Sequence, residues 1–260
     1  MSDQTQQPMI QSVVRAISIL KCVGEHRELG LTEISKMLGL HKSTAAGLIN
    51  TLKAERFLEI SGRTGKLRLG LGIFALAMNN SMELGEICDP YLDLLLEETG
   101  ETVNLIVRDG DQVVYVTKKD SAHSIRSSTR VGSRRPLHCT AAGKAMLAFM
   151  ERDEAKALID SFDMTAFTDR TITEKPRLHS ELDTIARDGV AFDLEEMEAG
   201  LVCVAAPVYY RPGNPVGAIS ISGPAMRMNG EALSRAADLL RKTSKQVCGE
   251  LTRLSARQEI

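Results

Sequence analysis

Hydrophobic residues recur at helical spacing in two short segments near the start of the chain, and a sharp turn separates them. The first segment, from Thr32, has apolar positions at Ile34, Met37 and Leu38, and it stops at Gly39, which adopts a left-handed backbone without strain. The second segment has one apolar and one polar face. Its inward positions are Ala45, Leu48, Ile49 and Leu52, and its outward positions are Lys42, Ser43, Ala46, Gly47, Asn50 and Lys53. The pattern predicts a helix, a tight turn and a second helix with one exposed face.

Two short runs of alternating residues follow the second helix. LeuGluIle at 58–60 and LysLeuArgLeu at 66–69 flank SerGlyArgThrGly, a sequence typical of a hairpin with a glycine-containing turn. An additional helix, capped by Ser12 and ending near Gly24, is expected before them. Three helices followed by a hairpin predict a winged helix-turn-helix domain in residues 1–70, and this order of elements indicates DNA binding.

The rest of the chain predicts a second domain of mixed structure. Residues 71–87 are expected to form a linking helix that could pair with its copy in a dimer, and Asp89 with Pro90 predicts the start of a separate helix. In residues 88–260 strands and helices then alternate, with an AspGly turn between 102–107 and 112–117. Hairpins without regular crossovers predict an α/β (α+β) fold with an antiparallel sheet.

Composition restricts the class of protein, and charge separates its two parts. The chain has 260 residues, 43% of them hydrophobic and 25% charged, which is ordinary for a globular protein of two domains. Residues 1–70 hold ten Lys and Arg against six Asp and Glu, whereas the remainder holds 22 against 28. The basic half fits a phosphate-bearing partner, and the acidic half does not.

The location of the protein follows from what the sequence lacks. No apolar run approaches the roughly 20 residues of a membrane-spanning helix, and the polar opening MSDQTQQPM has no features of a signal peptide. Five scattered cysteines without a CxxC pair indicate buried thiols and neither disulfides nor a zinc finger. We therefore expect a cytoplasmic protein that needs no cofactor or metal.

Polar residues of the second helix and of the hairpin are the candidate contacts to double-stranded DNA. Residues of the helix are expected near the major groove, and basic residues of the hairpin on phosphates or in a minor groove. The candidates are Lys42, Ser43, Thr44, Asn50 and Lys53 on the helix and Arg63, Lys66 and Arg68 on the hairpin.

A small-molecule site is expected in the second domain. Thr140 to Gly143 should form the first turn of a helix, where unpaired N–H groups and the helix dipole favour a carboxylate, and small side chains allow close approach. Ser220 and Ser222 lie two apart on a predicted strand and therefore share a face, with Ile221 on the other. These features predict a small hydroxylated or keto acid as the ligand.

The sequence resembles the IclR family of bacterial transcriptional regulators in three blocks. The blocks are LTEISKMLGLHKST, VGSRRPLHCTAAGKAMLA at 131–148, and GVAFDLEEMEAGLVCVAAPV at 189–208 followed by AISISGP at 218–224. The resemblance implies a GAF-like effector domain, dimers that usually pair into tetramers, and control of catabolic genes by a small metabolite. We expect a repressor of a catabolic operon, although repressors and activators share the same protein parts. It also implies that the effector site is lined by Ala141, Ala142, Asp193, Cys203, Ser220 and Ser222.

Two positions depart from the family pattern. Gly47 stands where relatives often carry an arginine in the recognition helix, and Arg56 stands where a glycine usually precedes the wing. Since arginine is the commonest reader of guanine edges, the operator sequence cannot be inherited from the family.

Residues of the second domain are also compatible with other functions. A metal- or redox-responsive regulator could use His138, Cys139, Asp193 and Cys203 as ligands or thiols. Catalysis by Cys139 is the weakest hypothesis, because sequence neighbours on an extended segment point in opposite directions and His138 would not reach the thiol as a base. AAGKAM lacks the glycine and hydroxyl residue of a phosphate-binding loop, which excludes that motif.

Overall fold

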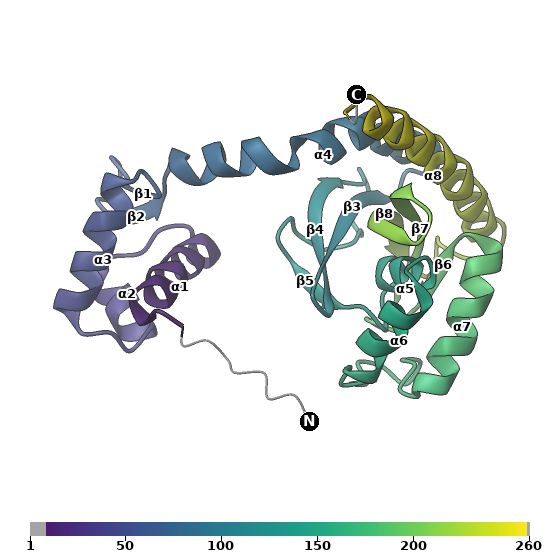
Figure 1. Cartoon of the computed structure of the whole chain (residues 1–260), viewed down its shortest axis with the longest axis horizontal. Coiled ribbons are helices and arrows are strands. Elements are labelled where there is room, and N and C mark those ends of the chain that lie inside the picture. Colours follow the sequence, from purple (N-terminus) through teal and green to yellow (C-terminus); the bar gives the residue numbers. More distant parts are fainter. Residues whose placement is uncertain (1–8, 259–260) are drawn as a thin grey trace. The chain divides into compact units, whose positions relative to one another are not determined.

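A computed structural model describes residues 9–258, with the side chains of 74–83 and 255–258 outside the description. The chain forms two compact units, Met1–Met82 and Glu83–Ile260, which divide within one helix (Figure 1). Each unit has its own hydrophobic core. None of the described helices is both long and apolar enough to span a lipid bilayer.

Unit 1 is a winged helix-turn-helix, as predicted. Its elements are α1 (Gln11–His26), α2 (Leu31–Met37), α3 (Lys42–Ala54), β1 (Leu58–Ile60) and β2 (Leu67–Leu69). The two strands pair antiparallel, and Leu29 bonds to the other edge of β2 through its N–H and C=O, at 3.0 and 2.9 Å from Leu67. The core joins all three helices to the wing through Ile19, Ile34, Ala45, Ile49 and Leu58.

The turn between α2 and α3 forms as expected, but the predicted helix caps are wrong. Gly39 has φ +62°, and the Leu40 N–H donates to the Ser35 carbonyl at 2.9 Å. The residue before α2 is Gly30, not Thr32, and the Gly30 N–H donates to the Glu33 carboxylate at 2.6 Å. The glutamate satisfies the N–H group of the residue before the helix, which is one half of a capping box, and glycine has no side chain to supply the other half. Likewise, α1 starts at Gln11 without a cap from Ser12.

Arg56 has a left-handed backbone between α3 and β1, with φ +61°. The Gly72 N–H donates to the Arg56 carbonyl at 2.9 Å, which fixes this conformation at the start of the next helix. A non-glycine residue is strained there, by about 1–2 kcal/mol. The arginine that stands here in place of the expected glycine therefore carries backbone strain.

We expect Arg56→Gly to stabilise the native state by about 0.5–1 kcal/mol, because the released strain exceeds the extra freedom that glycine gives the unfolded chain. Thermal unfolding of the full chain measures the change. Glu55→Gly is the matched control, since Glu55 has φ −83° and should lose stability. An equal loss of stability in both variants would contradict the strain at Arg56.

Unit 2 is built on a six-stranded antiparallel sheet of order β5-β4-β3-β8-β7-β6. The strands are β3 (Thr102–Asp109), β4 (Gln112–Lys119), β5 (Arg134–Pro136), β6 (Ala191–Leu194), β7 (Leu201–Arg211) and β8 (Asn214–Pro224). The antiparallel sheet and the hairpin of β3 and β4 were predicted. The edge strand β5 was not, because three residues carry too little pattern.

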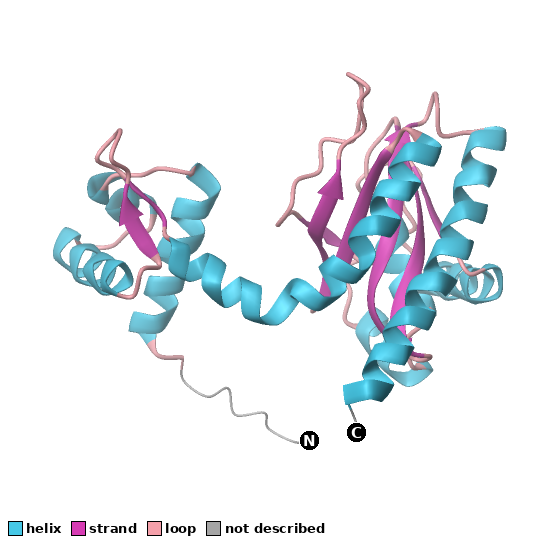
Figure 2. Ribbon diagram, turned by 90° about the horizontal axis from the view of Figure 1, so that it is seen from above, coloured by secondary structure: helices cyan, strands magenta, loops and turns pink. Residues whose placement is uncertain are grey.

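Helices cover both faces of this sheet (Figure 2). α4 (Leu71–Thr99), in its second half, and α8 (Gly230–Gln258) pack on the face that carries Ile219 and Ile221. α5 (Ala141–Ala148), α6 (Arg152–Asp160) and α7 (Lys175–Asp188) pack on the opposite face. The second face also carries the polar residues described below.

The prediction of a separate helix starting at Asp89 and Pro90 is wrong, since α4 runs through both residues. The Asp89 carboxylate does not cap a helix; it accepts from the Lys119 ammonium at 3.0 Å. Buried Cys88 and Leu92 hold this stretch against the sheet. Packing on both sides of Pro90 thus outweighs the one backbone hydrogen bond that the proline removes.

Candidate functional site

The outward face of α3 carries the predicted helix residues of the first candidate surface. Lys42, Ser43 and Asn50 are exposed, while Thr44 and Lys53 are half-buried. α3 starts after His41, whose Nδ1 lies 2.7 Å from the Ser43 hydroxyl and also accepts from the Ser43 N–H at 3.4 Å. The residues form one polar strip, but a hydrogen bond to His41 already engages the Ser43 hydroxyl.

Two of the three basic residues predicted on the wing form ion pairs within unit 1. Lys66 Nζ lies 3.1 Å from the Glu33 carboxylate of α2, and an Arg68 guanidinium nitrogen lies 2.6 Å from Glu59 of β1. Arg63 forms no ion pair with any residue that the structure describes. The Gly30 N–H and then Lys66 hold the pKa of Glu33 below its usual value. Since exposed pairs contribute about 0–1 kcal/mol, an incoming phosphate could replace them at little cost.

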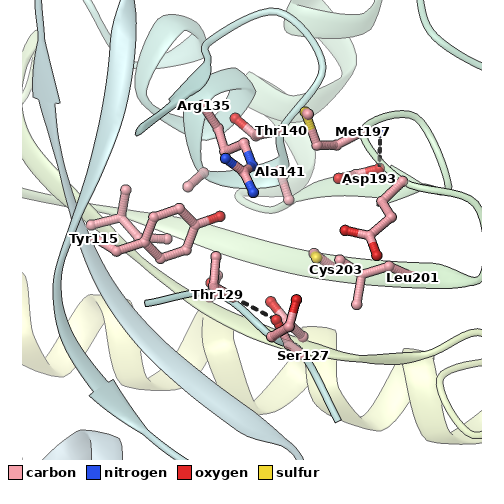
Figure 3. A pocket seen from close by; sticks show the side chains of 16 residues that line it. Tyr115, Ser127, Thr129, Arg135, Thr140, Ala141, Asp193, Met197, Leu201 and Cys203 are labelled. Carbon is pink, nitrogen blue, oxygen red and sulfur yellow. Dashed lines mark hydrogen bonds between the residues drawn. The ribbon is translucent and has the colours of Figure 1, made fainter. Parts of the chain in front are cut away.

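In unit 2, all six residues of the second candidate site line one small cavity (Figure 3). They come from the start of α5 and from β6, β7 and β8: Ala141, Ala142, Asp193, Cys203, Ser220 and Ser222. The cavity volume is about 30 Å³, enough for a water molecule or two, and the cavity is partly open to solvent.

Strand register explains why residues so distant in sequence meet. Asp193 pairs with Cys203, and Cys203 pairs with Ser222 on the next strand, so the three side chains lie in one row across the sheet. Ser220 and Ser222 face the cavity while Ile221 packs into the opposite core, as the alternation predicted.

The first turn of α5 closes the cavity above this row. Thr140 caps the helix, and its hydroxyl accepts from the Gly143 N–H at 3.2 Å. A Cβ at Gly143 would collide with the backbone of Leu137, so only glycine allows the helix to lie this close to the preceding segment. The backbone N–H groups of Ala141 and Ala142 begin the helix at the cavity wall.

Asp193 is the buried acidic group of the cavity. Its carboxylate accepts from the N–H groups of Glu196 and Met197 at 2.7 and 3.3 Å. Burial raises the pKa of Asp193 to about 7, against the lowering effect of the Glu196 hydrogen bond. Near neutral pH this group is therefore present in both its neutral and its charged form.

Several cavity residues were missed by sequence reasoning. Arg135, from the unpredicted strand β5, points its guanidinium into the cavity towards the Tyr115 hydroxyl (Figure 3). A segment with no regular structure adds the hydroxyl groups of Ser127, Ser128 and Thr129. The other lining residues are Met197 and Glu198 from the loop after β6, Leu201 from β7 and Ile106 from β3.

Asn104 supports the site from β3 and was also missed. It is fully buried, and its amide nitrogen donates to the hydroxyl oxygens of Ser220 and Ser222 at 3.2 and 3.4 Å. An alternating strand predicts that an asparagine at this position faces the polar side, but only the register with β8 places it beside both serines.

His138 and Cys139 do not form a joint reactive group. His138 Nε2 lies 3.1 Å from the Thr165 carbonyl, whereas the Cys139 thiol lies 3.6 Å from the Met197 sulfur. Burial raises the pKa of Cys139 to about 12 and also raises that of Cys203, which disfavours reactive thiolates. Within the part of the chain that the structure describes, no three His, Cys, Asp or Glu side chains are grouped to hold a metal ion.

A winged helix-turn-helix joined to a separate α/β unit is the arrangement of a DNA-binding transcriptional regulator. Residues 12–61 match the IclR helix-turn-helix domain, and residues 76–249 match the family described as bacterial transcriptional regulator IclR C-terminal. The chain belongs to the IclR family of DNA-binding transcriptional regulators.

Individual relatives agree over nearly the whole chain. The HTH-type transcriptional regulator KdgR of Escherichia coli is 34% identical over 253 residues, covering 96% of each chain. The HTH-type transcriptional repressor AllR of Salmonella typhimurium is 31% identical, covering 95% of this chain and 92% of the relative. These relatives are named as regulators, so the chain is a regulator and not an enzyme.

Solved structures show the same fold. The crystal structure of Thermotoga maritima IclR has a TM-score of 0.79 and 28% identity, covering 94% of this chain and all of that chain. An IclR homologue from Microbacterium hydrocarbonoxydans, complexed with 4-hydroxybenzoate, has a TM-score of 0.82 at 20% identity, with 93% and 99% covered.

Proposed function

We propose that the protein is a repressor of a catabolic operon whose binding to operator DNA is modulated by a small organic acid in the cavity of unit 2. The observation that carries the proposal is the convergence of six residues from four elements, separated by up to 81 positions in sequence, on one small cavity beside the start of α5. The cluster puts one carboxyl and two hydroxyl groups on the wall that faces the N–H groups at the start of α5, which supports a binding role.

The charges of the cavity favour an acid in one orientation. The carboxylate would accept from the N–H groups of Ala141 and Ala142, with Arg135 as its countercharge. The other end of the ligand, with a hydroxyl or keto oxygen, would face Asp193 in its neutral form and the serine hydroxyls. The 4-hydroxybenzoate bound by the Microbacterium hydrocarbonoxydans homologue is likewise a hydroxylated acid.

Because the cavity has a volume of only about 30 Å³, an organic acid can enter only if its walls move. A ligand that prefers an enlarged cavity shifts the population of the protein towards that state. We propose that residues 71–87 link this change to the DNA-binding domain in residues 1–70, with residues 88–260 as the effector domain.

We also propose that the working form is a homodimer or a dimer of dimers acting in the cytoplasm. A helix-turn-helix monomer contacts few bases, and pairing two copies doubles the recognised sequence and matches the symmetry of a palindromic operator. The apolar residues of the 71–87 segment support a contact between copies, as inferred from sequence.

The test uses the full-length protein and DNA from upstream of its own gene. Acids such as pyruvate, glycerate and 4-hydroxybenzoate are screened by thermal shift, since a ligand at 100 times its Kd adds roughly 2.7 kcal/mol to stability. Acids that stabilise the protein should change DNA retardation, and Ser222→Ala should weaken their effect. Ser244→Ala is the control, because that buried hydroxyl bonds to the Pro207 carbonyl outside the cavity. No retardation of any fragment, even at low salt, would refute the proposal.

The wing cations give a second, electrostatic prediction. Lys66→Ala should reduce the slope of log Kd against log salt by about 1, because one phosphate contact is lost. Glu33→Gln should instead tighten binding about twofold, since it removes the carboxylate that competes for the Lys66 ammonium. Lys156→Ala, on α6 of unit 2, is the control. An unchanged slope for Lys66→Ala would argue against a phosphate contact.

A further inference from the structure

Gly47 lies in the middle of the exposed face of α3, between Ser43 one turn before it and Asn50 nearly one turn after it. Its backbone is not left-handed, so the conformation does not require glycine. A Cβ built at this position has no heavy atom of the described chain within 4 Å. Neither backbone geometry nor packing within the chain therefore explains a glycine here.

Glycine in a helix interior weakens the helix relative to alanine, because it loses more backbone freedom on folding. Three other glycines of unit 1 have a structural reason: Gly39 is left-handed, and side chains at Gly70 and Gly72 would collide with the backbone of Arg56. Gly47 has none of these reasons. The space at Gly47 is open to whatever contacts α3 from outside.

The surroundings of Gly47 indicate what that contact is. The Thr51 hydroxyl donates to the Gly47 carbonyl at 3.1 Å, so its single hydrogen is engaged along the helix. Hydrogen-bonding side chains flank the gap at Ser43 and Asn50, and Lys42 stands at the start of the helix. The exposed face of α3 therefore has an uncharged position without a side chain at Gly47, surrounded by polar and basic side chains. This arrangement fits a DNA groove, which has base edges at its floor and phosphates along its sides.

We propose that Gly47 is a specificity-determining residue, which allows the α3 backbone to approach base edges of the operator and brings Ser43 and Asn50 within hydrogen-bonding distance of them. The inference rests on the proposed DNA-binding function and adds the residue that sets the depth of the helix in the groove. A methyl group at position 47 would hold the helix away from the bases while the phosphate contacts of the wing remain.

The experiment uses the full-length wild type to select preferred duplexes from a random-sequence library, and then compares a preferred duplex with a scrambled one. Gly47→Ala should weaken binding to the preferred duplex about tenfold or more and leave binding to the scrambled duplex within about twofold. The same variant should raise the thermal midpoint of unit 1 by a few degrees. Loss of affinity together with a gain in stability is a combination that general damage to the fold does not produce.

Gly249→Ala is the matched control, because Gly249 is also inside a helix, α8, and a Cβ there also has no neighbour within 4 Å. It should leave both duplexes bound as in the wild type. The inference is overturned if Gly47→Ala binds the preferred duplex as tightly as the wild type, or if binding to both duplexes falls equally. If the wild type enriches no sequence at all, it is the proposed function that fails.

Discussion

Lys144→Met is expected to destabilise unit 2 by about 3–5 kcal/mol, since it leaves a buried carboxylate without its countercharge. Lys144 is fully buried on α5 and forms an ion pair with Glu196, whose side chain is only 8% exposed, and a second pair with Glu181 of α7 at 3.3 Å. Methionine keeps the length and apolar stem of lysine, so the loss of stability measures the effect of removing the positive charge. Thermal and urea unfolding of the full chain measure it.

The controls separate the buried pair from the exposed one. Glu181→Gln should cost less than about 1 kcal/mol, because Glu181 is 36% exposed and water can replace it. The double variant Lys144→Met with Glu196→Leu should recover most of the lost stability, since two apolar groups of similar size need no countercharge. A single variant as stable as the wild type would show that Glu196 finds another partner or water.

This ion pair also holds a wall of the cavity proposed to bind the effector. Glu196 precedes Met197 and Glu198, which line the cavity, and the Thr171 hydroxyl donates to the Glu196 carbonyl at 2.6 Å. Lys144 lies on the same helix as Ala141 and thus ties the helix at one wall to the loop at the other. An effector that enlarges the cavity must either move both together or weaken this pair.

Sequence patterns predicted the parts of the structure that depend on local periodicity. The helix-turn-helix follows from apolar spacing and from Gly39, which needs only its own backbone to end a helix. The shared orientation of Ser220 and Ser222 follows from the period of a strand, whatever that strand pairs with. Both features are determined by residues that are close together in the sequence.

Features that depend on pairing between distant elements could not be predicted. Asn104 meets the two serines only because β3 pairs with β8 in one register, and Arg135 reaches the cavity only because three residues form an edge strand. Long-range packing likewise keeps α4 continuous through Pro90. From its charge alone, Lys66 is expected to be free to contact a phosphate. Its ion pair with Glu33 joins residues 33 positions apart in sequence, so local patterns could not predict it.

Asp193→Asn is expected to stabilise unit 2 above pH 7 and to have much less effect near pH 5. The pKa of Asp193 is raised to about 7 by burial, whereas the same carboxyl in the unfolded chain titrates near 3.8. Between these values the native state keeps a proton that the unfolded state has released, so the stability of the wild type falls as pH rises through this window. Asparagine cannot ionise and avoids this loss, yet its side-chain oxygen can still accept from Glu196 and Met197.

The expected gain of the variant between pH 5 and pH 8 is about 3 kcal/mol, since two pH units separate pH 5 from the pKa of Asp193, about 7, and each unit corresponds to about 1.4 kcal/mol. Unfolding of both proteins at each pH cancels the other titratable groups, which they share. The same ionisation should weaken binding of an organic acid to the wild type above pH 7, because the ligand then faces a second negative charge, and Asp193→Asn should abolish that pH dependence. A stability difference that stays constant from pH 5 to pH 8 would mean that Asp193 is already charged in the native cavity, and the neutral partner proposed for the ligand would have to lie elsewhere.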